Sequence, residues 1–328
     1  DQPAPHPRCG YRRGALVLVA VAALVSGEHF LDAQRLSCRN NTCLQFRQLC
    51  DLILAAGSTL GLMTLRTKVF NNLLAIVKEC LMTYSVRNNF TESWARDSWL
   101  QWVMFAGIWV SSSLLRGVVL SLERPGGSAG GTPWRQASSL AIFAVASFAF
   151  VGITYGILYV SGALSRMIDA FCMDFVVNQD VEKSLLAWNT LQALLHQASG
   201  ELERAFLVLT TTTLVMLLLG LNSLLLHDGA DSWWLPSIVI LCLGVLRTIF
   251  RAAAVTEDCI RVPALINSFV SADDMDSKRH YLVEYITYSN AGFYIGEIRL
   301  TASMAVKLTY IGCVVAFAVL TKVSSGGD

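Results

Sequence analysis

Charged residues are scarce in this chain. Asp, Glu, Lys and Arg make up 15% of its 328 residues, whereas hydrophobic residues make up 54%. Soluble domains carry roughly 25% charged residues, so this sequence lacks the charges that would cover a water-exposed surface. The composition therefore excludes an ordinary soluble domain. A formal net charge of +1 also gives no indication of a nucleic-acid partner.

Catalytic and metal-binding patterns are missing as well. The five histidines are scattered without an HExxH pattern, and the nine cysteines form neither a CxxC pair nor a Cys/His cluster. The sequence contains no P-loop, no Rossmann glycine pattern and no nucleophile elbow. We therefore expect no enzyme, no metal ion and no other cofactor.

The hydrophobic residues gather into blocks long enough to cross a bilayer, of about 18 to 27 residues. Because backbone polar groups in lipid must bond to one another, we expect these blocks to be helices. The sequence thus predicts an all-α, polytopic membrane protein. A polar tail at 1–13 precedes a single transmembrane domain at 14–328. Its seven expected transmembrane helices lie at about 15–31, 51–66, 99–122, 137–163, 205–227, 233–255 and 298–321.

Residues 11–27 fit two interpretations. An arginine pair, a short apolar run and small residues near Gly27 are compatible with a first transmembrane helix, and equally with a secretory signal peptide. Both interpretations place residue 32 and the following loop outside the cell. The sequence begins at Asp1 and not at Met, which leaves open a fragment or a processed product.

Lys and Arg are distributed unevenly among the connecting segments, and they concentrate in cytoplasmic loops of membrane proteins. If the N-terminus is inside, the segments on the inner side carry more than twice as many of them as those on the outer side. The inner set is 1–13, 67–98, 164–204 and 256–297, and the outer set is 32–50, 123–136, 228–232 and 322–328. Arg247 and Arg251, at the predicted inner end of their helix, follow the same bias. We expect a multi-pass plasma-membrane protein with its N-terminus inside and its C-terminus outside.

Two of the inner segments, 67–98 and 164–204, carry apolar residues at intervals of three and four. This spacing is typical of one face of a helix. We expect both segments to be amphipathic helical connections between transmembrane helices.

The first outer loop carries a glycosylation sequon at Asn40. Cys38, Cys43 and Cys50 lie in the same loop, where an oxidising environment would allow one disulfide among them and leave one thiol over. A second sequon, at Asn89, falls on the inner side and is expected to stay unmodified.

Polar and aromatic residues near the outer ends of the spans are candidates for a ligand pocket. Arg116, in the outer half of its span, is expected to pair with Glu123 or a lipid phosphate, or alternatively to meet an anionic ligand. Aromatic residues at this depth serve as interfacial anchors or line the mouth of a pocket. The candidate pocket residues are Arg116, Asn222, His227, Trp233 and Trp234.

The last span contains Thr309-Tyr310, five apolar residues, and then Ala316-Phe317. This pattern resembles the signature of arthropod gustatory receptors, in which Thr-Tyr and five apolar residues precede Gln-Phe. Ala316 departs from it by replacing the Gln. Further stretches similar to that family are Gly292–Tyr294, Arg299–Lys307 and 188–226.

The resemblance to this division of the insect odorant and gustatory receptor superfamily implies a subunit of a ligand-gated, non-selective cation channel. It implies a homo- or hetero-tetramer whose four last helices surround the pore, with a pocket for a small-molecule tastant or odorant. Cys313, Ala316 and Phe317 would then face or border the pore, and Thr309 and Tyr310 would hold the helix in register.

Two other classes stay open as alternatives. A G-protein-coupled receptor also has seven helices, but it has the opposite orientation, and the Asp-Arg-Tyr and Asn-Pro-x-x-Tyr motifs are absent. A small-solute transporter commonly shows paired repeats with broken helices. We detect no such symmetry in this sequence.

Overall fold

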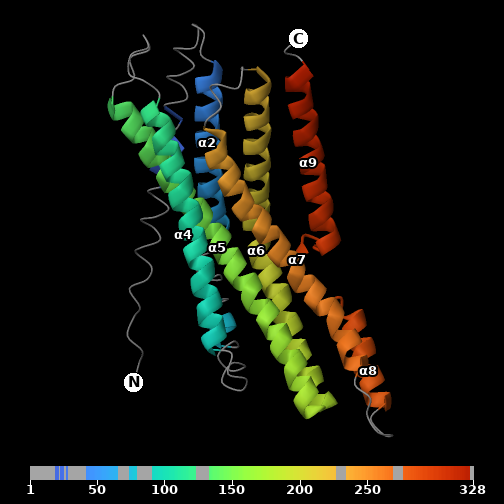
Figure 1. Ribbon diagram of the computed structural model, residues 1–328. Coiled ribbons are helices and arrows are strands. Elements are labelled where there is room, and N and C mark those ends of the chain that lie inside the picture. The colour runs from blue at the N-terminus through green and yellow to red at the C-terminus, as the bar shows by residue number, and fades with distance from the viewer. Residues whose placement is uncertain are drawn as a thin grey trace, which may run out of the picture.

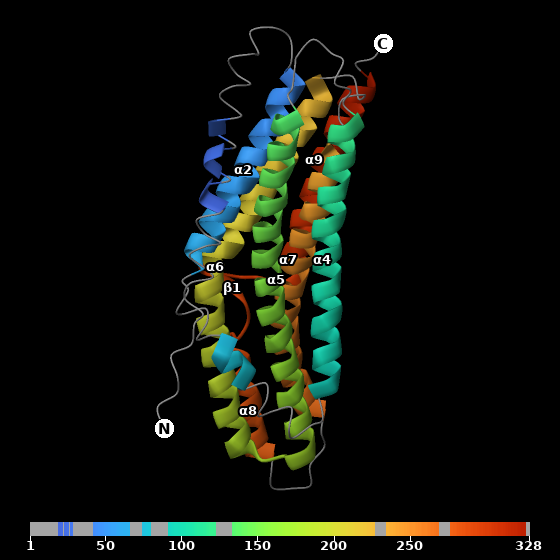
Figure 2. The same ribbon diagram turned by 90° about the vertical axis from the view of Figure 1, so that its left-hand side faces the viewer.

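The computed structural model describes residues 42–65, 74–79, 91–122, 133–226, 234–268 and 276–325, together with 19–21, 23–25 and 27–28. The described part is almost entirely helical, which confirms the expected all-α class. Its long helices form one elongated bundle with alternating direction (Figures 1 and 2). These helices are α2 (Thr42–Thr64), α4 (Thr91–Leu122), α5 (Pro133–Asn178), α6 (Val181–Leu226), α7 (Leu235–Ser268) and α9 (Ala302–Ser325).

Two smaller elements lie between α7 and α9. Helix α8 (Asp276–Tyr288) lies at the lower end of the bundle in Figure 1. A short antiparallel hairpin follows it, with β1 (Tyr294–Ile295) paired to β2 (Ile298–Arg299). Gly296 adopts a φ of 63° in the turn between these strands, a conformation that most L-residues avoid.

Helix α5 is the centre of the bundle and packs against α2, α4, α6 and α7. Phe143, Phe150, Ile157 and Leu164 are buried and recur every seven residues along it. This spacing returns each side chain to nearly the same side of a helix, so the four residues form a continuous apolar stripe. Large apolar side chains on the outside of the bundle, such as Leu114 and Leu243, stay exposed.

Four helices of the described part are long and apolar enough to cross a bilayer. The qualifying stretches are Arg96–Ser121, Gln136–Asn178, Val181–Ser223 and Leu235–Ser268. The chain is therefore a membrane protein of several helices. The total of seven spans and the orientation of the termini stay predictions, and most of the expected first span lies outside the described residues.

The predicted connection at 164–204 is not a separate segment. Helix α5 continues through it to Asn178, and α6 begins at Val181. The two helices are separated only by Gln179, whose φ of 47° ends α5, and by Asp180. The Lys183 backbone N–H donates to Asp180 Oδ1 over 3.2 Å and so caps α6. The amphipathic pattern correctly predicted helix, but the prediction placed helix ends where the apolar composition changed.

The length of α5 and α6 has a consequence for the membrane. A helix of 46 residues spans about 69 Å, more than twice the hydrocarbon core of about 30 Å. Both helices therefore extend well beyond the bilayer. Outside it, the Lys183 ammonium and backbone N–H hold the pKa of the Asp180 carboxyl below its usual value.

Helix α2 begins earlier than predicted. The stretch 42–50 was expected to belong to an outer loop, but it is the first part of α2. Asp51 was expected at the edge of its span and is instead buried within the bundle, opposite Arg116 of α4. Helix α4 likewise begins at Thr91 and takes over the last residues of the predicted 67–98 connection.

The buried ion pair between Arg116 Nη2 and Asp51 Oδ2 joins α4 to α2. The Arg116 side chain is 1% exposed, and its guanidinium carbon lies 5.3 Å from the centroid of the Phe143 ring on α5. Asp51 was not predicted as a partner of Arg116, and Glu123, which was, lies outside the described residues. Because each buried charge requires the other, the pair fixes how α2, α4 and α5 pack together.

We expect Asp51→Leu and Arg116→Leu each to lower the free energy of unfolding by about 3 kcal/mol, because each leaves a buried charge without this partner. The double variant should be more stable than either single variant, since it removes both charges together. Thermal unfolding of the purified protein in detergent, followed by size-exclusion chromatography with fluorescence detection, measures this. Additive losses in the double variant would contradict the pairing.

Candidate functional site

The start of α9 is held by a side chain of α7 and by the side chain of the residue just before α9. The Ala302 backbone N–H donates to Glu257 Oε1 of α7 over 3.1 Å, and the Met304 N–H donates to Thr301 Oγ1 over 3.4 Å. The first N–H groups of a helix have no partner inside it, so these bonds cap α9. They also fix the point at which it leaves α7.

The segment before α9 is docked just as firmly. The Phe293 N–H donates to Thr256 Oγ1 over 2.9 Å, and the Tyr294 N–H donates to Ser199 Oγ of α6 over 3.2 Å. The Phe293 side chain is fully buried, with its ring centroid 6.2 Å from that of Phe206. A Cβ at Gly292 would lie 2.7 Å from Arg299 Nε and 3.1 Å from Thr256, so a larger residue there would displace the Arg299 side chain. The base of α9 is thus fixed to both α6 and α7.

Beyond its base, the described part of α9 is uncovered. Ala305 is buried, and Thr309 is half-buried with its hydroxyl bonded to the Ala305 carbonyl over 2.9 Å. Farther along, Tyr310 is 68% exposed and Phe317 is 69% exposed. Figure 1 shows α9 at the edge of the bundle. So much apolar surface in a single chain requires lipid or another protein against it.

Three residues of the predicted pore motif, Tyr310, Cys313 and Phe317, share one stripe of α9. Tyr310, Cys313, Val314 and Phe317 stand at intervals of three and four, which places them on one side of a helix, and all four are exposed. The side chain of Ala316 lies outside the described residues. The structure therefore brings Tyr310, Cys313 and Phe317 onto a common surface, while Thr309 bonds back to its own helix.

The predicted ligand-pocket residues are spread over several elements. Arg116 lies between α2, α4 and α5 and is engaged with Asp51. Asn222 is exposed near the upper end of α6, and Trp234 is buried just before α7 begins. Trp234 Nε1 is buried without a hydrogen-bond partner among the described residues. His227 and Trp233 lie outside the described residues.

The predicted modification sites of the first outer loop lie mostly outside the described residues. This holds for Asn40, for Cys38 and for the side chain of Cys43. Cys50 is a free, buried thiol in α2, next to Asp51.

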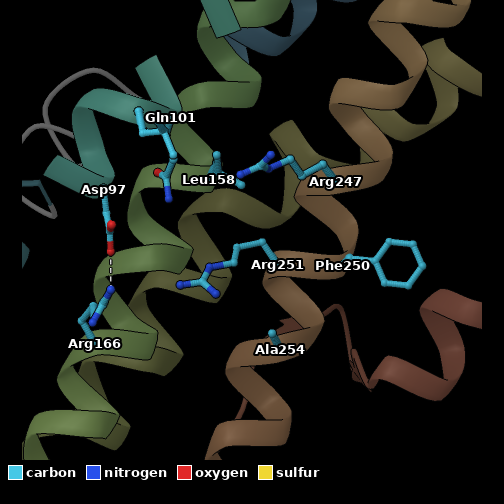
Figure 3. Close-up of a pocket in the computed structure, with 9 residues that line it drawn as sticks. Asp97, Gln101, Leu158, Arg166, Arg247, Phe250, Arg251 and Ala254 are labelled. Atoms are coloured by element: carbon cyan, nitrogen blue, oxygen red, sulfur yellow. Dashed lines mark hydrogen bonds and ion pairs between the residues drawn. The ribbon is translucent and has the colours of Figure 1, made fainter. Parts of the chain in front are cut away.

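A cavity of about 480 Å³ between α4, α5 and α7 was missed by the sequence analysis. Its polar lining residues are Asp97, Gln101, Arg166, Arg247 and Arg251 (Figure 3). Arg166 Nη2 forms an ion pair with Asp97 Oδ2 across the cavity wall. The sequence signal was the pair of arginines four residues apart, which had been used only to assign the inner side of the membrane.

Comparison with solved structures shows what this architecture is similar to. The olfactory receptor OR5 of the insect Machilis hrabei superposes with a TM-score of 0.62, at 10% sequence identity over 98% of this chain and 93% of that one. The same receptor in complex with eugenol gives a TM-score of 0.64, at 8% identity over 97% of this chain and 92% of that one. No family profile and no curated protein sequence matches the chain. The chain thus has the fold of insect olfactory receptors, so the predicted resemblance to the insect odorant and gustatory receptor superfamily is confirmed at the level of the fold.

Proposed function

We propose that the protein is a chemosensory receptor of the plasma membrane that works as a ligand-gated, non-selective cation channel subunit. The observation that carries the proposal is α9, an apolar helix fixed at its base and uncovered along the rest of its described length. In a tetramer, four such helices would cover one another and surround a central path. The likeness in fold to an insect olfactory receptor supports this arrangement.

Phe317 and Cys313 are our candidates for the gate. In a ring of four α9 helices, the stripe with Tyr310, Cys313 and Phe317 would face the axis. Apolar rings of this kind close a pore by excluding water. Lys307, four residues before Ile311, is exposed in the single chain, and its long side chain can extend toward the aqueous end of the helix.

A small organic molecule is the proposed ligand. The solved relative binds eugenol, which is aromatic and carries polar groups. The upper end of this bundle offers matching chemistry in Asn222 and in Trp234, whose buried Nε1 has no partner among the described residues. Trp233 and His227 are proposed to complete the mouth of this pocket. The ligand is a tastant if the receptor is of the gustatory type. That assignment rests on the Thr309–Phe317 motif.

The proposed role of Phe317 in the gate can be tested before the ligand is identified. We expect Phe317→Ala to raise the ligand-free cation current several-fold, because a smaller ring no longer excludes water. Leu308→Ala is the matched control, because Leu308 is exposed and apolar but lies on the opposite side of α9. Whole-cell recording, with surface biotinylation to equalise expression, measures the effect.

The thiol of Cys313 allows the same current to be tested with a thiol-reactive reagent. A charged methanethiosulfonate reagent should block the Phe317→Ala current, and the added Cys313→Ser substitution should abolish the block. The buried thiol of Cys242 should not react. An unchanged current in Phe317→Ala, or a block that persists without Cys313, would count against a pore lined by α9.

The orientation is tested by glycosylation. A sequon tag on a flexible spacer after Asp328 should be glycosylated, whereas Asn89 should stay unmodified. Asn40→Gln should remove one glycan, and Asn89→Gln should remove none. Treatment with an endoglycosidase followed by a gel shift gives the result. An unmodified tag together with a modified Asn89 would exclude this channel topology and favour a G-protein-coupled receptor or a transporter.

A further inference from the structure

The cavity between α4, α5 and α7 has walls of two kinds. Its basic wall consists of Arg166 from α5 and of Arg247 and Arg251 from α7, with Asp97 as the one carboxylate in the lining. Its rim includes the apolar Leu100 of α4, which is 65% exposed, while the ring of Phe250 on α7 points away from the space (Figure 3). Figure 3 shows Gln101 and Arg251 extending into the space from α4 and α7, respectively. An occupant would therefore meet cations inside and hydrocarbon contacts at the rim.

The arginines are not equally neutralised. Arg166 forms an ion pair with Asp97. Within the part of the chain that the structure describes, Arg247 donates only to Met104 Sδ, and neither Arg247 nor Arg251 forms an ion pair. Asp169 does not line the cavity but lies within electrostatic range of Arg166 and Arg251. The lining consequently keeps an excess of positive charge.

Two buried polar atoms in the cavity lack a protein partner. Arg251 Nε and Gln101 Oε1 are both shielded from solvent and form no hydrogen bond among the described residues. Leaving such atoms unsatisfied destabilises the folded protein. Both side chains therefore have unused hydrogen-bonding capacity beside the cavity.

The surroundings place the cavity at the level of a membrane interface. Trp99 and Trp102 flank Gln101 on α4, are exposed, and stack with ring centroids 5.3 Å apart. Aromatic residues of this kind concentrate at the headgroup level of a bilayer. The long stems of Arg247 and Arg251 allow their guanidinium groups to reach the same level from within α7.

We propose that this cavity binds the headgroup of an anionic phospholipid, with its phosphate on Arg247 and Arg251 and its acyl chains along the exposed apolar side chain of Leu100. Arginine binds phosphate through paired N–H donors, which gives the contact geometric specificity. The exposed apolar rim favours a lipid over a free phosphate ion, which would gain nothing from it. The proposed lipid site requires the cavity, but it does not require that the protein conducts ions. Only its assignment to the cytoplasmic leaflet rests on the proposed orientation.

Lipid retention by the purified full-length protein tests the proposal. The protein in detergent is mixed with phosphatidylinositol 4-phosphate or with phosphatidylcholine, and bound lipid is counted by native mass spectrometry. We expect the double variant Arg247→Gln/Arg251→Gln to retain phosphatidylinositol 4-phosphate at least about tenfold less well, because it loses the charge-assisted bonds. Retention of phosphatidylcholine should not change. Arg261→Gln is the matched control, because Arg261 is exposed on the same helix outside the cavity.

Two further experiments distinguish loss of the lipid site from misfolding and from binding of a soluble anion. Arg247 is exposed, so Arg247→Gln alone should fold normally and still weaken retention of the anionic lipid, even if the double variant is unstable. Inorganic phosphate at equal concentration should not displace the lipid. Equal retention by Arg247→Gln and the wild type would overturn the proposal, and displacement by inorganic phosphate would assign the cavity to a soluble anion instead. No current is measured in these experiments. Their outcome therefore neither supports nor contradicts the proposed channel function.

Discussion

The attachment of α9 to α6 and α7 is the constraint on which the functional interpretation depends. Glu257 and Thr256 on α7 and Ser199 on α6 accept hydrogen bonds from the backbone just before and at the start of α9. These bonds set the position of a helix whose described side chains are mostly exposed beyond its base. A helix held only at its base can belong to one chain and still present most of its surface to other copies. Without this attachment, the exposed stripe of Tyr310, Cys313 and Phe317 would have no fixed orientation relative to the other helices.

Helix α7 connects this attachment to the cavity. Arg247 and Arg251 line the cavity, and Thr256 and Glu257 follow within two turns of the same helix. Ser165 of α5 donates to Asp258, the next residue, so the central helix is joined to α7 at this level as well. The proposed lipid contact and the base of α9 therefore share one rigid element.

The sequence predicted much of the architecture because hydrophobic length and helical periodicity are local signals. The apolar blocks at 99–122 and 137–163 lie within α4 and α5, and α6 and α7 contain most of the blocks at 205–227 and 233–255. The extension of α5 to Asn178 was missed because a change from apolar to amphipathic composition does not end a helix. Its end required a left-handed residue at Gln179 and a cap at Asp180.

The site was less predictable because its contacts join distant parts of the chain. Nothing local to Arg116 indicates that Asp51, 65 residues earlier, neutralises it. Arg247 and Arg251 are visible in the sequence, but their meeting with Asp97 and Arg166 depends on how α4, α5 and α7 pack. The exposed stripe on α9, in contrast, follows from a motif within nine residues, which is why Cys313 and Phe317 were predicted as neighbours on one side of the helix.

The mass of the purified assembly tests the central claim most directly, because a tetramer is what would cover α9. Static light scattering of the full-length protein in a mild detergent, corrected for bound detergent, gives the number of copies. The account predicts four copies of the 35.9 kDa chain in one particle. A folded, stable particle with a single copy would leave the apolar surface of α9 to detergent alone, and it would contradict a pore built from four last helices.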